Sequence, residues 1–178
     1  MLLLVAGACV CAHAQETGPA DKVANLAGPA SAVGAGDVAL PAAGASAIGF
    51  VVDPLTGVAL NGFDVVSYFT EATPLPGKPD FEYDWSGAPW YFATKANRDV
   101  FIEHPEVYAP QFAGHGAMAV ARGFLSDGNP RVYLVFGNRL YLFYSAGNRD
   151  AFVLSGNEIV DRAHAQWRDL VTAANAGR

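Results

Sequence analysis

The fold is decided by the stretch WSGAPWYFATKANRDVF at residues 85–101, which returns as FGNRLYLFYSAGNRDAF at residues 136–152. The two stretches align without a gap at an offset of 51 residues, and Asn-Arg-Asp-x-Phe recurs intact. A run of strand character precedes each turn, at residues 81–85 and 132–136, and a second aromatic run follows it. This pattern is typical of a β-hairpin, so the sequence predicts two hairpins.

A helix is expected after each hairpin. Thr94 and Ser145 stand where a side-chain hydroxyl accepts a hydrogen bond from an unpaired amide of the first helical turn. Phe101 and Phe152 then follow at the same distance from the two caps, and we expect both to be buried against their hairpins. Each copy is therefore predicted to be a hairpin followed by a helix that a phenylalanine holds in place.

The remaining segments complete an α+β outline. Asp64 can cap a short helix, three prolines make residues 73–79 a loop, and residues 116–122 are predicted to form a short helix that ends at Gly123. Apolar residues at helical spacing predict the longest helix over residues 158–174. The fold class is thus a small single α+β domain with two hairpin-plus-helix units, related by the offset of 51, and a long C-terminal helix.

The N-terminal composition predicts export. Residues 1–14 are apolar and end in the small-x-small pattern Ala12-His13-Ala14, which is typical of a signal peptide cleaved near Ala14. Residues 15–48 are rich in Ala, Gly and Pro and are expected to form a flexible tether, which leaves a domain over residues 49–178. We therefore expect a periplasmic or secreted protein. Acylation of one of the two cysteines is the alternative.

Charge and composition exclude several classes of partner. Both cysteines lie in the segment expected to be removed, so no thiolate metal site can form in the mature chain. The net charge of -6 and the lack of a Lys or Arg cluster argue against a nucleic-acid partner. The mature chain is also expected to have no transmembrane segment.

Several motifs, taken in order, carry a resemblance to a known family. They are DPLTGVAL at 53–60, NGFDVVSYF at 61–69, WYF at 90–92, NRD at 97–99 and PEVYAP at 105–110. As an ordered set they resemble the exported bacterial branch of the YHS domain family, and the likeness runs from about Asp53 to Trp167. The resemblance implies a small α+β domain. It also implies a metal-related role, because other branches accompany heavy-metal transporters and carry cysteines.

The chain departs from that family where metal would bind. Thr56 stands in place of the cysteine of Asp-Pro-x-Cys-Gly, and Ala93 in place of a cysteine after the aromatic strand. Exported relatives are expected to read Gly-Gly-Tyr-Cys-Ala where this chain reads AGHGA at residues 113–117. Thiolate binding is therefore not carried over.

The substitution at residues 113–117 offers a different pair of metal ligands. His115 and Met118 are three residues apart and share a face if a helix begins near Gly114. Imidazole with thioether suits copper, zinc is a further candidate, and His104 or the more distant His164 would supply a third ligand. The alternative is that Met118 packs in the core and His115 is satisfied by a hydrogen bond.

Three further residues are candidate ligand contacts. Arg98 and Arg149 occupy equivalent places in the repeat, and Trp90 would join them if its ring were exposed. The structural interpretation is that the arginines are solvated or locally paired and that Asp99 and Asp150 favour the positive ends of their helices.

No catalytic motif occurs in the chain, although a dispersed set of catalytic residues would leave no motif. We therefore expect an exported binding module without catalytic activity, whose ligand is a small molecule, a metal ion or an envelope protein. The alternatives are a protein-interaction or structural module of the cell envelope, and an enzyme with a dispersed site.

Overall fold

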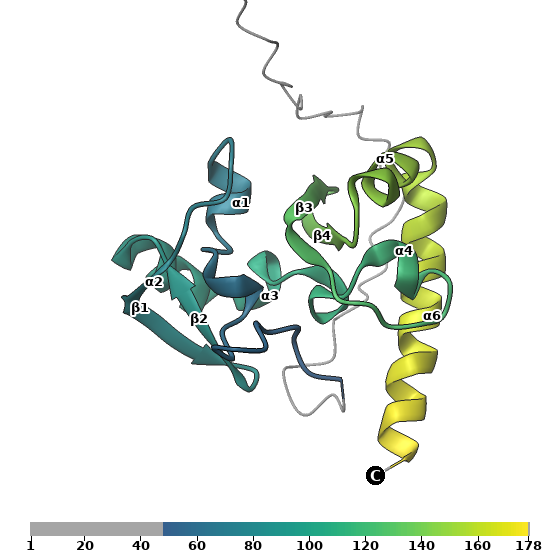
Figure 1. Cartoon of the computed structure of the whole chain (residues 1–178), viewed down its shortest axis with the longest axis horizontal. Coiled ribbons are helices and arrows are strands. Elements are labelled where there is room, and N and C mark those ends of the chain that lie inside the picture. Colours follow the sequence, from purple (N-terminus) through teal and green to yellow (C-terminus); the bar gives the residue numbers. More distant parts are fainter. Residues whose placement is uncertain (1–47, 178) are drawn as a thin grey trace, which may run out of the picture. The chain divides into compact units, whose positions relative to one another are not determined.

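The structure is a computed structural model, and it describes residues 48–177. The predicted signal peptide and nearly all of the predicted tether lie outside the described residues. The elements are η1 (Leu60–Gly62), α1 (Ser67–Thr70), β1 (Lys78–Trp85), β2 (Ala88–Phe92), α2 (Lys95–Glu103), α3 (Pro105–Tyr108), η2 (Gln111–Gly114), α4 (Ala117–Val120), β3 (Asn129–Phe136), β4 (Arg139–Phe143), α5 (Ala146–Leu154) and α6 (Gly156–Ala176). They form the small α+β domain that the sequence predicts (Figure 1).

The two hairpins and their helices repeat at the offset of 51 residues. β1, β2 and α2 begin and end 51 residues before β3, β4 and α5. The two-residue loops Ser86-Gly87 and Gly137-Asn138 both have positive φ, which is the type I′ geometry that suits a right-twisted hairpin. The ladders share one register, and each has an irregularity at the same place. The predicted repeat is confirmed.

Each helix is capped and anchored as the sequence predicts. Thr94 Oγ1 accepts from Asn97 N at 3.1 Å, and Ser145 Oγ accepts from Asn148 N at 3.3 Å. Phe101 and Phe152 are fully buried. The ring centroid of Phe152 lies 5.1 Å from that of Phe143, and Phe101 lies 5.2 Å from the equivalent Phe92. One buried phenylalanine per copy therefore joins helix to hairpin.

Strand β4 is buried on both faces and connects the two cores. Leu140 and Leu142 belong to the apolar cluster built around β2 and α2, whereas Tyr141 and Phe143 belong to the cluster around α5 and α6. Successive side chains of a strand point to opposite faces, so β4 serves both clusters at once. This is why β4 lacks the half-buried alternation of β2.

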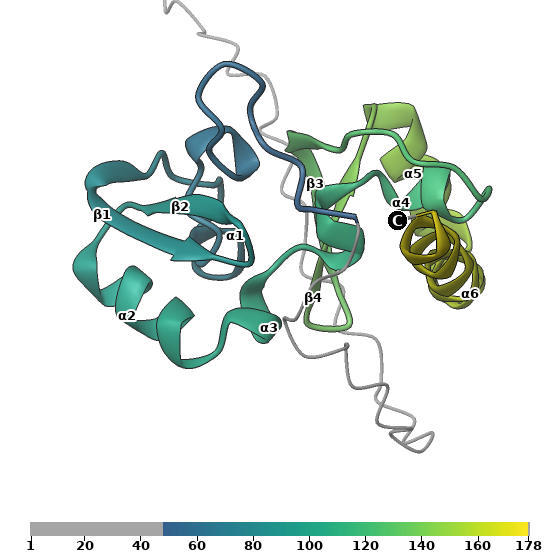
Figure 2. The ribbon, with the colours of Figure 1, turned by 90° about the horizontal axis from the view of Figure 1, so that it is seen from below.

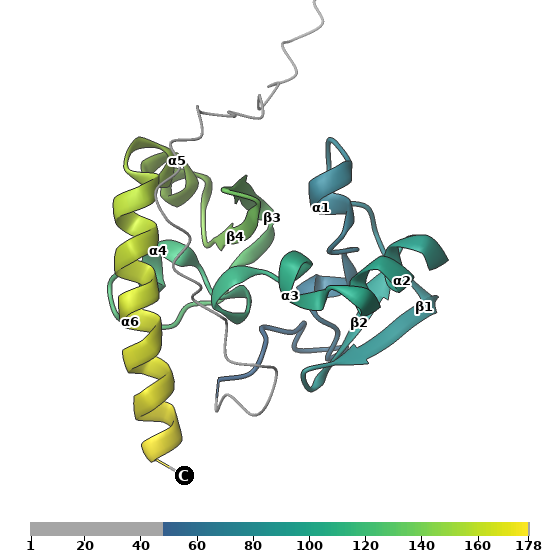
Figure 3. The same cartoon turned by 180° about the vertical axis from the view of Figure 1, so that it is seen from behind.

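The long C-terminal helix covers the second hairpin and its helix. α6 contacts α4 and α5, and it buries Ile159 and Ala163 among side chains of β4. Figures 2 and 3 show it beside the green half of the domain, away from β1 and β2. The helix predicted over residues 158–174 is confirmed. In the part of the chain that the structure describes, no helix combines the length and apolarity needed to cross a membrane.

The repeat extends further upstream than the sequence comparison detects. Gly62 ends η1 and Gly114 ends η2, and each follows two other residues of positive φ. Gly77 N then donates to Gly62 O, as Gly128 N donates to Gly114 O. A Cβ on Gly77 or on Gly128 would lie 2.5 Å from main-chain atoms, so both close approaches require glycine. We call residues 60–103 the first unit and residues 112–154 the second unit.

Two details differ from the sequence expectations. The proline-rich loop ends at Gly77, and Pro79 lies within β1, where a two-stranded ladder leaves one side of the strand unpaired. Asp99 and Asp150 do not stabilise the positive ends of their helices, because neither α2 nor α5 has an acid in its first turn. The short helix before Gly123 is confirmed as α4.

Removing the anchor of the second unit will test this account of the packing. We expect Phe152→Ala to lower the free energy of unfolding by about 3–5 kcal/mol, because it leaves a cavity between α5 and β4. Chemical denaturation measures this loss, with Val153→Ala as the matched control, since Val153 is 52% exposed. Equal losses from the two variants would contradict the role given to Phe152.

Candidate functional site

His115 lies between η2 and α4, at the edge of the second core. Its side chain is 11% exposed, and its Nδ1 lies 3.7 Å from Oδ1 of Asp127, whose side chain is 77% exposed. Nδ1 is buried and has no hydrogen-bond partner in residues 48–177. The ring also contacts Trp167 of α6, with centroids 6.1 Å apart. His115 therefore has one nitrogen that could bind a proton or a metal ion.

Burial lowers the pKa of His115 below its ordinary value, and the Asp127 carboxylate opposes this shift only in part. The pKa of His164 is lowered too, chiefly by burial and then by Arg139 and Arg168. The His164 ring packs on Phe112, with centroids 5.0 Å apart. Both histidines are thus neutral at neutral pH, which is the state that can bind a metal.

The other proposed metal ligands do not gather around His115. Helix α4 begins at Ala117, and His115 has extended dihedrals, so the helical face expected to join His115 and Met118 is not formed. Met118 packs in the second core, and His104 is exposed between α2 and α3. Within the described range, no three His, Cys, Asp or Glu side chains are placed to hold a metal. The described residues therefore do not make a complete copper or zinc site.

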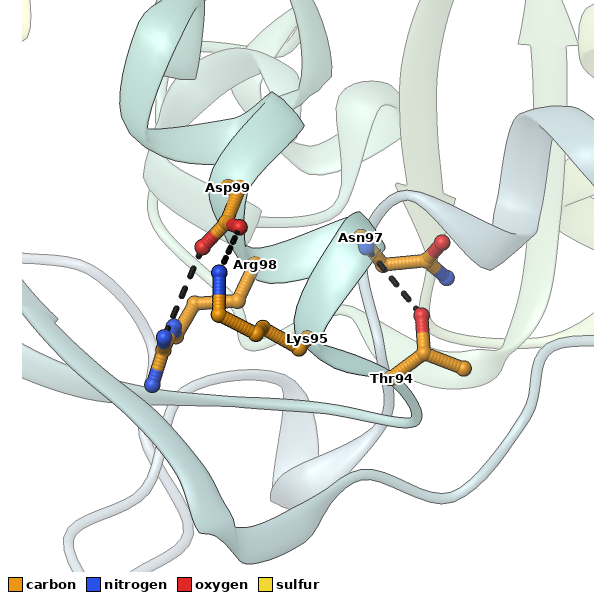
Figure 4. A network of polar contacts seen from close by, with 5 residues as sticks. All are labelled: Thr94, Lys95, Asn97, Arg98 and Asp99. Atoms are coloured by element: carbon orange, nitrogen blue, oxygen red, sulfur yellow. Dashed lines mark hydrogen bonds and ion pairs between the residues drawn. The ribbon is translucent and has the colours of Figure 1, made fainter.

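The paired arginines are engaged locally. Arg98 Nη2 lies 3.4 Å from Oδ1 of Asp99, and Lys95 Nζ donates to the other oxygen of that carboxylate at 2.5 Å (Figure 4). The hydrogen bond from Lys95 holds the pKa of Asp99 below its ordinary value. Arg149 contacts Asp150 in the same way, at 3.2 Å. The arrangement favours the structural interpretation of both arginines.

Trp90 lies in the first core. Its side chain is 1% exposed, its Nε1 donates to Trp85 O at 3.0 Å, and its ring contacts Phe50, Trp85 and Phe101. A ligand at the surface could not reach this ring, so Trp90 serves packing.

Among the described residues, the Asp64 side chain accepts the most hydrogen bonds, although the sequence identified Asp64 only as a helix cap. It is fully buried, and Oδ1 accepts from Val66 N at 2.9 Å in the turn before α1. Its Oδ2 accepts from Ala93 N at 2.8 Å and from Asn97 Nδ2 at 2.6 Å, at the junction of β2 and α2. One carboxylate therefore links three segments of the first unit.

The second unit has no side chain at the position equivalent to Asp64. Asp64 N donates to Leu75 O and lies two residues after Gly62, and Gly116 N donates to Ser126 O two residues after Gly114. Gly116 is therefore the counterpart of Asp64. Tyr144 and Asn148 are the counterparts of Ala93 and Asn97 at the offset of 51.

A surface pocket of about 140 Å³ lies on this part of the second unit. Its lining residues are Ala119, Arg122, Phe124, Ser126, Tyr144 and Asn148. None of the six is a carboxylate, and within residues 48–177 no ion pair engages Arg122. The pocket thus combines a free cation, hydrogen-bonding groups and exposed aromatic surface.

Sequence reasoning missed the pocket because it missed the upstream half of the repeat. Gly62 and Gly77 are separated by 15 positions, whereas Gly114 and Gly128 are separated by 14, so a gapless comparison loses the correspondence. The signal that could have found it is the paired spacing of these glycines, together with Pro79 and Pro130 two residues further on.

Replacing Asp64 will test its structural role. We expect Asp64→Asn to lower the free energy of unfolding by about 1–3 kcal/mol. The new amide nitrogen would face hydrogen-bond donors that now bind the carboxylate, and a buried polar group would be left unpaired. Thermal and urea denaturation measure the loss, with the exposed Asp84→Asn as the control. An Asp64→Asn protein as stable as that control would contradict the network.

Comparison with known proteins identifies one region that is similar to a known family. The model of the YHS domain family matches residues 66–112, which cover most of the first unit and end before His115. No curated protein and no solved structure matches the chain. The chain therefore contains a region similar to the YHS domain, and the pocket of the second unit lies outside that region.

Proposed function

We propose that the protein is an exported binding module without catalytic activity and that its ligand binds to the second unit. The observation that carries the proposal is the difference between Asp64 and Gly116. In the first unit, the buried Asp64 carboxylate lies inside this backbone arrangement. In the second unit, which has Gly116 at that position, the same backbone arrangement is accompanied by a surface pocket. The apolar N-terminal segment with its cleavage pattern supports export.

The chemistry of the pocket favours binding over catalysis. Phe124 and Tyr144 are 49% and 68% exposed, and aromatic surface beside a few polar groups is typical of ligand sites. Of the common general acids and bases, the six lining residues include one tyrosine, Tyr144, and no histidine, lysine, cysteine or acid. Ser126 consequently has no histidine, lysine or carboxylate beside it in the lining that could activate its hydroxyl.

A ligand screen by NMR tests this proposal. We expect compounds from a library of small polar molecules to shift the backbone amides of Ser126, Tyr144 and Asn148 in ¹⁵N–¹H spectra. The equivalent amides of the first unit, Leu75, Ala93 and Asn97, are the internal control and should stay in place, because Asp64 already occupies that position.

Three outcomes would overturn the proposal. If compounds shift only the amides of the first unit, the ligand binds elsewhere. If no small molecule shifts the pocket amides, the protein is an interaction or structural module instead. Turnover of a compound that binds would contradict the absence of catalysis.

A metal-related role is the second candidate. It is favoured by the match to the YHS domain and by the unpaired Nδ1 of His115 beside Asp127. With only these two protein ligands, water would occupy the other coordination positions of a zinc or copper ion. Metal binding would therefore be weak, and a chelator would reverse it.

Metal titration tests this second candidate. We expect His115→Ala to abolish zinc or copper binding measured by calorimetry, and the exposed His104→Ala to leave it unchanged. Because the pKa of His115 is lowered, protons compete with the metal ion for Nδ1 only at pH values below the ordinary pKa of histidine. Metal binding should therefore persist at pH 6.5 and weaken as the solution becomes more acidic. Binding that survives His115→Ala would eliminate this site.

A further inference from the structure

We propose that the ligand of the second unit is a small carboxylic acid, whose carboxylate binds where the Asp64 carboxylate would lie if the second unit had one. This inference rests on the proposed function and names the chemical class of its ligand. The first unit supplies the pattern, because it shows which groups of this scaffold hold a carboxylate.

The donors that hold the carboxylate in the first unit have counterparts in the second. Asp64 Oδ2 receives hydrogen bonds from the backbone N–H of Ala93 and the side-chain amide of Asn97. Tyr144 offers the same backbone N–H, and asparagine is retained at position 148. Both residues line the pocket.

The position of Gly116 connects the pocket to this pattern. A Cβ on Gly116 would lie 3.4 Å from Tyr144 N, so a carboxylate attached to it would come within reach of that N–H group, as the Asp64 carboxylate reaches Ala93 N. Within residues 48–177, Tyr144 N–H and the Asn148 side-chain amide donate to no protein acceptor. Two donors that the first unit uses for a carboxylate are therefore available.

The rest of the lining fits an organic anion. Arg122 supplies a positive charge, and Ser126 supplies a hydroxyl. Charge-assisted hydrogen bonds to a carboxylate are stronger than neutral ones. Phe124 and Ala119 offer apolar contact to the remainder of the molecule. The volume of about 140 Å³ suits a short aliphatic or single-ring acid.

The experiment compares acids with neutral molecules of the same shape. The ¹⁵N-labelled protein is titrated with acetate, propionate and benzoate, and separately with acetamide, propionamide and benzamide. We expect the acids to shift the Tyr144 amide proton downfield with a saturable curve and the amides to leave it in place. Arg122→Gln and Asn148→Ala should each weaken binding by roughly tenfold or more, the effect of one charge-assisted hydrogen bond.

Installing the missing side chain gives an independent test. Gly116→Asp should place an internal carboxylate on Tyr144 N–H and Asn148, abolish binding of the acids, and raise Tm by about 3–6 °C over Gly116→Ala. Gly116→Ala is the matched control because it adds a Cβ without a carboxylate. Gly116 has negative φ, so both substitutions suit its backbone.

The outcomes separate this inference from the proposed function. If the acids leave Tyr144 unmoved while another compound from the ligand screen shifts the pocket amides, the carboxylate assignment is wrong and the proposed function stands. If no compound shifts those amides, both are wrong. If Gly116→Asp does not fold, the Arg122→Gln and Asn148→Ala titrations decide, and unchanged affinity in both would overturn the inference.

Discussion

The burial of β4 on both faces is the constraint on which the rest of the domain depends. Leu140 and Leu142 complete one core while Tyr141 and Phe143 complete the other, so a shift of one residue in the hairpin would exchange the two sets. The register of β4 is consequently fixed by both units at once. Tyr144 follows this strand directly, and its backbone is therefore held in one place although its ring is exposed.

The two units stabilise one shared scaffold in different ways. In the first, the Asp64 carboxylate connects the turn before α1 with the start of α2, and the region matched by the YHS model covers most of this unit. In the second, glycine removes that connection, and packing against α6 stabilises the unit instead. The support from α6 allows the second unit to leave polar groups unpaired near the surface without losing its core.

The sequence was sufficient for the parts of the fold that depend on neighbouring residues. Hairpins with two-residue turns, hydroxyl caps and a phenylalanine at a fixed distance are all local patterns, and each is present as expected. The His115–Met118 pair could not be judged in the same way, because it required a helix starting near Gly114, where positive φ ends a 3₁₀ turn instead. The contacts of Asp64 with Ala93 and Asn97 span 29 and 33 residues, and only the folded chain brings these groups together.

The Asp64 side chain has a practical use beyond its role in stability. From Cβ onward it is chemically an acetate group attached to the backbone, and its atoms record how this architecture orients such a group. When the first unit is superposed on the second unit, the Asp64 carboxylate gives a starting pose for a carboxylate ligand in the second unit. A medicinal chemist could extend a molecule from that pose, so the chain supplies the first fragment for the design of synthetic ligands.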